Sequence, residues 1–286
     1  MAEISASMVM KLRKISGQGM MDCKKALTEA DGDIDKAMEI LRKKGLATLE
    51  KRSDRETSEG IVIGVEGDNW ASLATLCCET DFVAKSSDFV AMAETVKDYM
   101  AACPSDEGAE SILETSVDGR KFNDVLTETV SKTGEKIQVG DYARFKLDGP
   151  GLIGIYIHFN GKVGAMVQFD ASDEAVAQAD VFKQTAADIA MHITATNPLA
   201  LDKDGIAPEI VEREKAIFAE QVQNKPPEII EKIVRGKLNK FFTENCLVDQ
   251  PFVKDDSKSV NQVVDETAKQ AGGGAKIKRF VRFAVG

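Results

Sequence analysis

The sequence has few of the residues on which catalytic triads and metal sites depend. Among its 286 residues are two histidines, His158 and His192, and its five cysteines never form a Cys-x-x-Cys pair. The cysteines are odd in number and scattered, which favours reduced thiols and argues against a zinc site. Neither histidine has a nucleophile or a paired partner at motif spacing, so the case for an enzyme is weak and no cofactor is expected.

Long apolar runs and an excess of basic residues are also missing. No segment approaches the roughly 20 apolar residues of a membrane span, and the first residues have neither the pattern of a signal peptide nor that of a transit peptide. We therefore expect a cytoplasmic protein with no membrane role. The net charge is −10, whereas a nucleic-acid-binding domain usually shows a basic patch, so direct binding to nucleic acid is disfavoured. An acidic surface suits a protein partner or simple solubility.

Residues 1–46 predict a compact unit of three short helices. Ser5 is placed to cap the first helix, and Gly17 to end it in a tight turn. Asp22 is placed to cap the second helix, and Gly45 to end the third. Apolar residues recur at three-four spacing along each of them, which is typical of helices that share a small core.

After a charge-rich linker or solvated helix tail at residues 47–59, one pattern of elements occurs twice. Residues 60–148 and residues 149–286 each begin with a glycine-led strand, a hairpin turn, a second strand and then a helix. Helices that follow antiparallel hairpins indicate two α+β subdomains with antiparallel sheets. The alternating run at 277–285 is expected to complete the second sheet. Neither copy holds a glycine-rich phosphate-binding motif.

A pair of amphipathic helices interrupts the second repeat at about residues 205–243. A turn at 224–227 separates the two helices, and each has a narrow apolar seam. This pattern predicts an antiparallel coiled-coil hairpin inserted in the second subdomain. Such an arm either docks on a partner or braces the core.

Two short segments carry residues suited to an interface, and each also has a plainer interpretation. Met20 and Met21, between the first two helices, are either a hydrophobic loop offered to a partner or flexible core fillers. Thr80, Asp81 and Phe82 lie between a predicted strand and a predicted helix. Either Thr80 or Asp81 caps the helix while Phe82 packs beneath it, or Asp81 and Phe82 form a rigid surface wedge that anchors an interface.

The run Thr80-Asp81-Phe82-Val83-Ala84-Lys85 resembles the Thr-Asp-Phe-Val-Ala-Lys signature of the translation elongation factor Ts family. The run from Gly17 to Leu27, Gly-Gln-Gly-Met-Met-Asp-Cys-Lys-Lys-Ala-Leu, resembles a second, N-terminal segment of that family. Two such runs in the family's order are far more specific than either alone. The resemblance extends over nearly the whole chain, through the paired repeats and the inserted hairpin. The family is the guanine-nucleotide exchange factor of elongation factor Tu.

The resemblance implies a fold, a partner and a set of contact residues. The N-terminal helices would form a module like the ubiquitin-associated fold. The partner would be elongation factor Tu, both GDP-bound and nucleotide-free, with a homodimer or a heterotetramer among the assemblies allowed. Phe82 would be a wedge that inserts beside the partner's magnesium and phosphate site so that GDP leaves, with Asp81 as its polar companion. The implied contact residues are Thr80, Asp81, Phe82 and Val83 in the wedge, and Leu12, Met20, Met21 and His158 outside it.

Two other functions remain open at this point. An adaptor would bind ubiquitin-like or other proteins through residues 1–46 and use the rest of the chain as a scaffold. An enzyme would use His158 or His192, although a lone histidine is more often structural. Substitution separates the first alternative from exchange activity, because an adaptor should tolerate Phe82→Ala.

Overall fold

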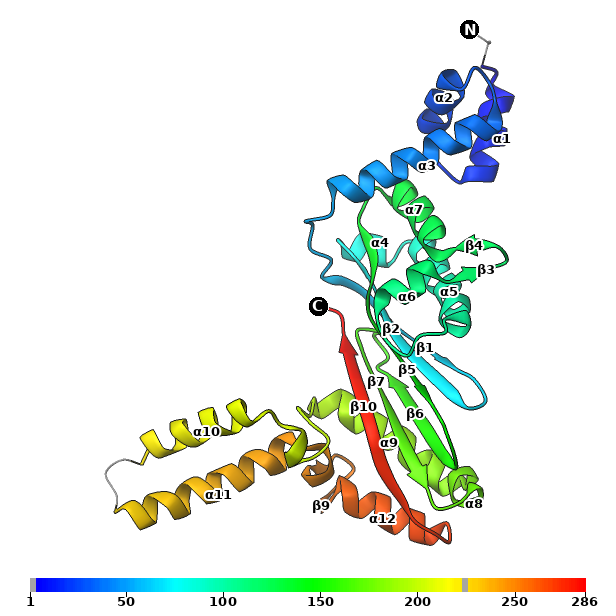
Figure 1. The fold of residues 1–286 in the computed structure, drawn as a ribbon. Coiled ribbons are helices and arrows are strands. Elements are labelled where there is room, and N and C mark those ends of the chain that lie inside the picture. Colours follow the sequence, from blue (N-terminus) through cyan, green and yellow to red (C-terminus); the bar gives the residue numbers. More distant parts are fainter. Residues whose placement is uncertain (1–3, 223–225) are drawn as a thin grey trace. The chain divides into compact units, whose positions relative to one another are not determined.

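The computed structural model describes residues 4–222 and 226–286, and the chain divides into two compact units. Among the described residues, the first unit holds 4–68, 72–144 and 283–286, and the second holds 69–71, 145–222 and 226–282. Each unit has one small three-stranded sheet with helices packed against it (Figure 1). This arrangement confirms the α+β class expected from the sequence.

Three helices begin the first unit: α1 (Ala6–Ser16), α2 (Met20–Glu29) and α3 (Ile34–Lys51). Ser5 caps α1 with its hydroxyl, and Gly17 ends it in the left-handed conformation with a φ of 68°. Both are the roles that the sequence predicted. We call residues 4–51 the N-terminal module.

The N-terminal module has an apolar core of its own. Its buried members are Val9, Leu12, Cys23, Ala26, Leu27, Ala30, Ala37 and Leu41. Asp22 does not cap α2, contrary to the prediction. The capping position is Gly19, and Asp22 lies in the first turn of the helix, where its carboxylate pairs with Lys44 Nζ at 2.6 Å.

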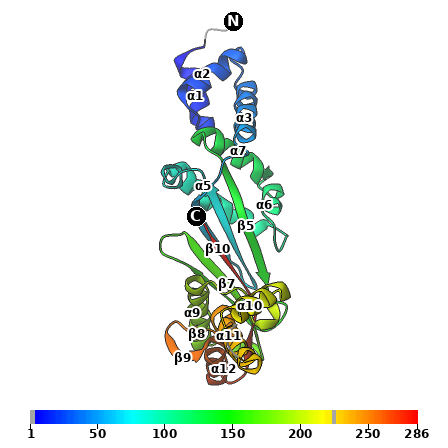
Figure 2. The same ribbon diagram turned by 90° about the vertical axis from the view of Figure 1, so that its left-hand side faces the viewer.

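Gly45 does not end α3, which continues to Lys51 and packs against α7 (Phe122–Thr133) (Figures 1 and 2). A Cβ atom on Gly45 would lie 2.7 Å from the carbonyl oxygen of Thr127. The glycine is therefore needed for the close approach of two helices rather than for a stop. The segment 47–59 accordingly begins as a helix tail and becomes a loop only after α3 ends.

The sheet of the first unit has the order β1-β2-β5, formed by β1 (Glu59–Glu66), β2 (Trp70–Cys78) and β5 (Ile137–Lys146). Around it lie the single-turn helix α4 (Asp81–Ala84), α5 (Ser87–Ala102), α6 (Ala109–Glu114), α7 and a small hairpin of β3 (Ser116–Val117) and β4 (Arg120–Lys121). The apolar spacing of residues 105–134 predicts helix throughout, and the small hairpin interrupts it.

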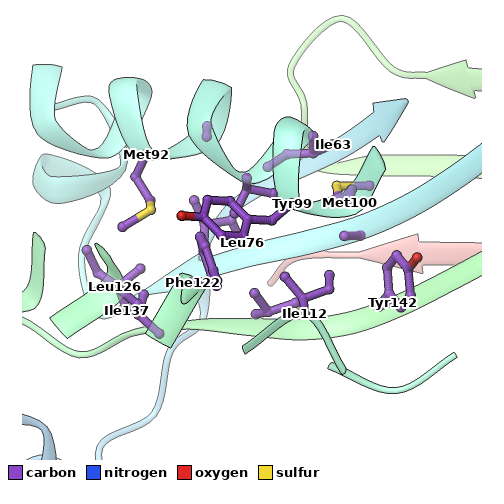
Figure 3. Packing of buried hydrophobic residues seen from close by; sticks show 14 of the residues in the cluster. Ile63, Leu76, Met92, Tyr99, Met100, Ile112, Phe122, Leu126, Ile137 and Tyr142 are labelled. Carbon is purple, nitrogen blue, oxygen red and sulfur yellow. The ribbon is translucent and has the colours of Figure 1, made fainter. Parts of the chain in front are cut away.

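The core of the first unit lies between this sheet and its helices (Figure 3). The helical spacing of Phe89, Met92, Val96 and Met100 predicts one buried face of α5, and all four side chains are buried. From the sheet, Leu76 of β2 is fully buried in the same cluster. Burial of about ten such side chains, at roughly 1.5–3 kcal/mol each, stabilises the platform that carries α4.

The second unit repeats this plan with the sheet order β10-β7-β6. Its strands are β6 (Gly151–Ile157), β7 (Val163–Ala171) and β10 (Ala275–Ala284), and β6 pairs antiparallel with β7. The final strand therefore completes the second sheet, as predicted. Smaller elements surround it: α8 (Glu174–Gln178), α9 (Asp180–Thr196), η1 (Lys203–Gly205), η2 (Leu247–Asp249), β8 (Pro251–Phe252), β9 (Asp255–Ser259) and α12 (Val260–Gln270).

Two helices, α10 (Pro208–Glu220) and α11 (Pro227–Asn245), lie in the chain between α9 and α12 and pack against each other (Figure 1). No described residue of either helix is fully buried, and their apolar side chains are at best half-buried. Such exposure is typical of a two-helix arm whose helices touch along one narrow apolar seam. The predicted turn at 224–227 lies partly outside the described residues.

Candidate partner-binding site

The end of β2 leads through Glu79 and Thr80 into α4, and Thr80 fixes the start of that helix. Its backbone is extended, and its hydroxyl oxygen accepts a hydrogen bond from Val83 N at 3.3 Å. Of the two capping residues that the sequence allowed, Thr80 is therefore the cap, and Asp81 belongs to the first turn.

Phe82 does not pack beneath the helix. Its side chain is 83% exposed, while its neighbours Val83 and Ala84 are half-buried against the core of the first unit. One side of the turn is thus anchored and the other projects an aromatic ring into solvent. An exposed phenylalanine on an anchored backbone is the arrangement expected of an interface anchor, because little conformational entropy is lost when it binds.

Asp81 is exposed beside Phe82 and pairs with Lys85 Nζ at 2.7 Å. The hydrogen bond from Lys85, only partly opposed by desolvation, holds the pKa of the Asp81 carboxyl below its ordinary value. Asp81 is therefore ionised at neutral pH. Because both partners are solvated, the pair is weak and Asp81 can leave Lys85 for another cationic group at little cost.

Two glutamates support the turn from beneath, and both escaped the sequence interpretation. Glu135, between α7 and β5, accepts from Thr80 N at 3.1 Å and from the Thr80 hydroxyl at 2.7 Å. Glu79 accepts from Lys136 N at 2.6 Å and from Arg52 Nη1 at 2.7 Å. Burial works against ionisation of Glu79, but the hydrogen bonds from Lys136 and Arg52 outweigh it and lower its pKa. No periodicity or motif links these residues, so no sequence signal could have found the contacts.

In the N-terminal module, Met20 and Met21 are the first two residues of α2, and they are 43% and 65% exposed. They are therefore not core fillers. Leu12, also expected as a contact residue, is fully buried in the core of the module and offers no exposed surface to a partner. The exposed apolar side chains of α1 that sequence reasoning missed are Met10 and Ile15.

His158 belongs to the second unit, directly after β6. Its Nδ1 atom lies 3.3 Å from the Tyr156 hydroxyl. Its ring lies against that of Phe159, with the ring centres 4.4 Å apart and the planes tilted by 52°, and Phe159 is 91% exposed. Beside it is a shallow apolar hollow of about 320 Å³, whose lining includes Met191 and Val253. Phe159 is a second exposed aromatic residue that the sequence interpretation did not single out.

His192, the other histidine, is fully buried and has structural partners. Its Nδ1 accepts a hydrogen bond from Val253 N at 3.3 Å, and its Nε2 donates one to the side-chain oxygen of Gln250. Within residues 4–222 and 226–286, no cluster of three or more His, Cys, Asp or Glu side chains could hold a metal ion. In the same residues no helix has the length and hydrophobicity needed to span a membrane.

Comparison with known proteins identifies the family. A family model described as Elongation factor TS matches residues 79–286. Curated relatives named Elongation factor Ts are 45% identical in a Nitratiruptor species, 42% in Alkalilimnicola ehrlichii and 40% in Clostridium botulinum. Each alignment covers 99% of this chain and 92–93% of the relative. The chain therefore belongs to the elongation factor Ts family and is a translation elongation factor.

Proposed function

We propose that this chain is the guanine-nucleotide exchange factor of elongation factor Tu. It binds the GDP-loaded partner in the cytoplasm, promotes release of GDP and allows reloading with GTP during protein synthesis. The observation that carries the proposal is the exposure of Phe82 on an anchored turn within the signature Thr80 to Lys85. The chain contributes binding and no covalent chemistry.

Phe82 acts as a wedge beside the magnesium and phosphate site of the partner, and Asp81 accompanies it with a negative charge. A wedge catalyses exchange only if it fits the nucleotide-free partner better than the loaded one. By linkage, bound nucleotide then lowers the partner's affinity for the factor by the same ratio by which the factor lowers the partner's affinity for nucleotide. A carboxylate is suited to this task, because it opposes the phosphates and competes for the cation that holds them.

Further contacts come from Met20 and Met21 in the N-terminal module and from His158 in the second unit. Methionine suits such a surface because its unbranched thioether adapts to the shape of a partner. His158 lies against an apolar hollow and the exposed ring of Phe159. Leu12 has no part in the proposed interface, since it is buried.

The test is release of a fluorescent GDP analogue from elongation factor Tu, chased with excess unlabelled GDP. Wild type should accelerate release, and Phe82→Ala should lower the acceleration on the order of 30-fold, as expected for a hot-spot anchor of about 2 kcal/mol. Leu199→Ala, which truncates an exposed apolar residue of the second unit, is the matched control and should behave as wild type. Circular dichroism should be unchanged in both variants.

The outcomes separate the proposal from its alternatives. No acceleration by wild type would overturn the exchange function and favour an adaptor that binds proteins through the N-terminal module. Acceleration by wild type and Phe82→Ala alike would preserve the function but move the decisive contact to Met20 and Met21 or to His158.

A further inference from the structure

The direction of the Phe82 ring cannot be set by packing of the ring itself, because most of it is in solvent. It must be set by the backbone of α4, which has only four residues. A single helical turn is not stable alone, since nucleation fixes several residues for one hydrogen bond. Something outside α4 therefore has to hold it.

Val83 and Ala84 hold one side of the turn by packing against the core of the first unit, and Glu135 holds its start through Thr80. One carboxylate oxygen accepts from Thr80 N at 3.1 Å, and the other accepts from the Thr80 hydroxyl at 2.7 Å. With its proton committed to Glu135, the hydroxyl presents a lone pair to Val83 N. The capping geometry of α4 thus depends on a carboxylate that is 55 residues away along the chain. Hydrogen bonds to an ionised acceptor are stronger than neutral ones.

The contact is one half of a reciprocal arrangement. Glu135 takes the backbone N–H of Thr80, and Glu79 takes the backbone N–H of Lys136 at 2.6 Å. Each segment therefore donates a main-chain hydrogen bond to the carboxylate of the other. Gly134, at a φ of 72°, ends α7 and turns the chain so that Glu135 comes directly after the helix. Two crossed contacts fix both the distance and the register of the segments.

We infer that Glu135 is a positioning residue for the exchange wedge: it holds Thr80 so that α4 presents Phe82 in one orientation. The inference rests on the proposed function of Phe82. Glu135 acts on the partner only through this turn, and its removal leaves Phe82 in place on a turn that samples other backbone conformations.

The first measurement is exchange activity in a double-mutant cycle of Glu135→Ala and Phe82→Ala. Glu135→Ala removes both hydrogen bonds to Thr80 and should lower exchange on the order of tenfold. In the Phe82→Ala background the same substitution should change nothing further, because there is no ring left to position. Additive effects of the two substitutions would overturn the inference. Glu114→Ala, which removes an exposed carboxylate paired with Lys121 in the same unit, is the control for lost charge and should leave exchange unchanged.

The second measurement does not depend on exchange. Amide hydrogen exchange at Val83 and Ala84, whose N–H groups donate to the Thr80 hydroxyl and carbonyl, should be faster in Glu135→Ala on the order of tenfold. Unchanged protection there would overturn the inference even if the activity falls. If Phe82→Ala proves fully active, the proposed wedge fails, and this measurement still decides whether Glu135 orders the turn.

Glu135→Gln is a second variant, needed in case Glu135→Ala does not fold. The amide keeps one oxygen to accept a hydrogen bond but loses the charge and the second acceptor. It should retain the wild-type melting temperature and show an exchange rate between those of wild type and Glu135→Ala. An exchange rate equal to wild type, with wild-type protection of Val83, would contradict a positioning role for the carboxylate.

Discussion

His192 and Gln250 form a buried hydrogen bond, with the imidazole Nε2 2.9 Å from the Gln250 side-chain oxygen. The other ring nitrogen accepts from Val253 N, so Nε2 carries the proton and the ring is neutral. The Gln250 amide nitrogen in turn donates to the carbonyl of Glu244 at 2.8 Å. The pair joins α9 to the end of α11, and it requires an uncharged imidazole.

The first prediction follows from this requirement: the protein loses stability as the pH falls below about 6.5. Burial lowers the pKa of His192, with the hydrogen bond to Gln250 opposing it in part. The unfolded chain then binds more protons than the folded one below the ordinary histidine pKa. The stabilising contribution is complete above that value and is lost as the pH drops toward the folded pKa, by at most about 1.4 kcal/mol per pH unit. Urea unfolding at neutral and at mildly acidic pH measures it.

His158→Gln and His192→Gln are the matched pair for this experiment, since the chain has no other histidine. His158→Gln keeps the buried imidazole of His192 and is the control for replacing a histidine. His192→Gln should be less stable at neutral pH, and its stability should change less between neutral and mildly acidic pH. A steep profile in His192→Gln would assign the acid sensitivity to other groups.

Much of the fold can be predicted from local sequence patterns. The predictions that failed have one physical cause in common. The helical spacing of Phe89, Met92, Val96 and Met100 predicted α5 and its buried face. In β2 no single face is buried, because all residues from Ala71 to Cys78 are. Ser5 and Gly17 act within one turn of their own helix, and both roles were predicted. Gly45 was misjudged because its function is set by Thr127 of another helix. A glycine in a helix pattern can either end the helix or allow another helix to approach closely, and only the tertiary contacts decide which.

The candidate site shows the same division. The motif located Thr80, Asp81 and Phe82, but residue types alone left open whether the ring packs inside or projects outward. The structure shows it outward, on a turn whose first residue is hydrogen-bonded by Glu135, which is remote in the sequence and carries no motif. For Leu12 the resemblance suggested a surface contact, but the residue is buried, because a place near the N-terminal motif does not make a side chain accessible.

Two glycines inside helices should respond oppositely to alanine. At Gly45 a methyl group would meet the Thr127 carbonyl and the α3–α7 contact would have to open, at a cost of about 1–3 kcal/mol. At Gly236 in α11 nothing lies within 4 Å, so alanine should stabilise by about 0.5–1 kcal/mol through helix propensity. Chemical denaturation of the two variants measures both signs. A stabilised Gly45→Ala would show that the helices do not pack as closely as described.

The cap on α4 predicts a graded series at position 80. Thr80→Ser keeps the hydroxyl and should preserve both stability and exchange. Thr80→Val keeps the shape but leaves Val83 N and one oxygen of Glu135 without the hydroxyl, and should cost about 1 kcal/mol of stability. Thermal unfolding and GDP release, measured on the same samples, test the series. Equal activity of Thr80→Ser and Thr80→Val would mean that the hydroxyl does not order the wedge.

The ion pair of Asp81 and Lys85 predicts a difference between its two members. If Asp81 presents its charge to the partner, Lys85 competes for that charge in the free protein. Lys85→Met should then leave exchange unchanged or slightly faster, whereas Asp81→Asn should slow it, with no measurable change in melting temperature in either, since both groups are solvated. The effect of Asp81→Asn should shrink at high salt, where exposed charges are screened. If both substitutions slow exchange equally, the pair itself is required, and the charge of Asp81 acts within this chain and not on the partner.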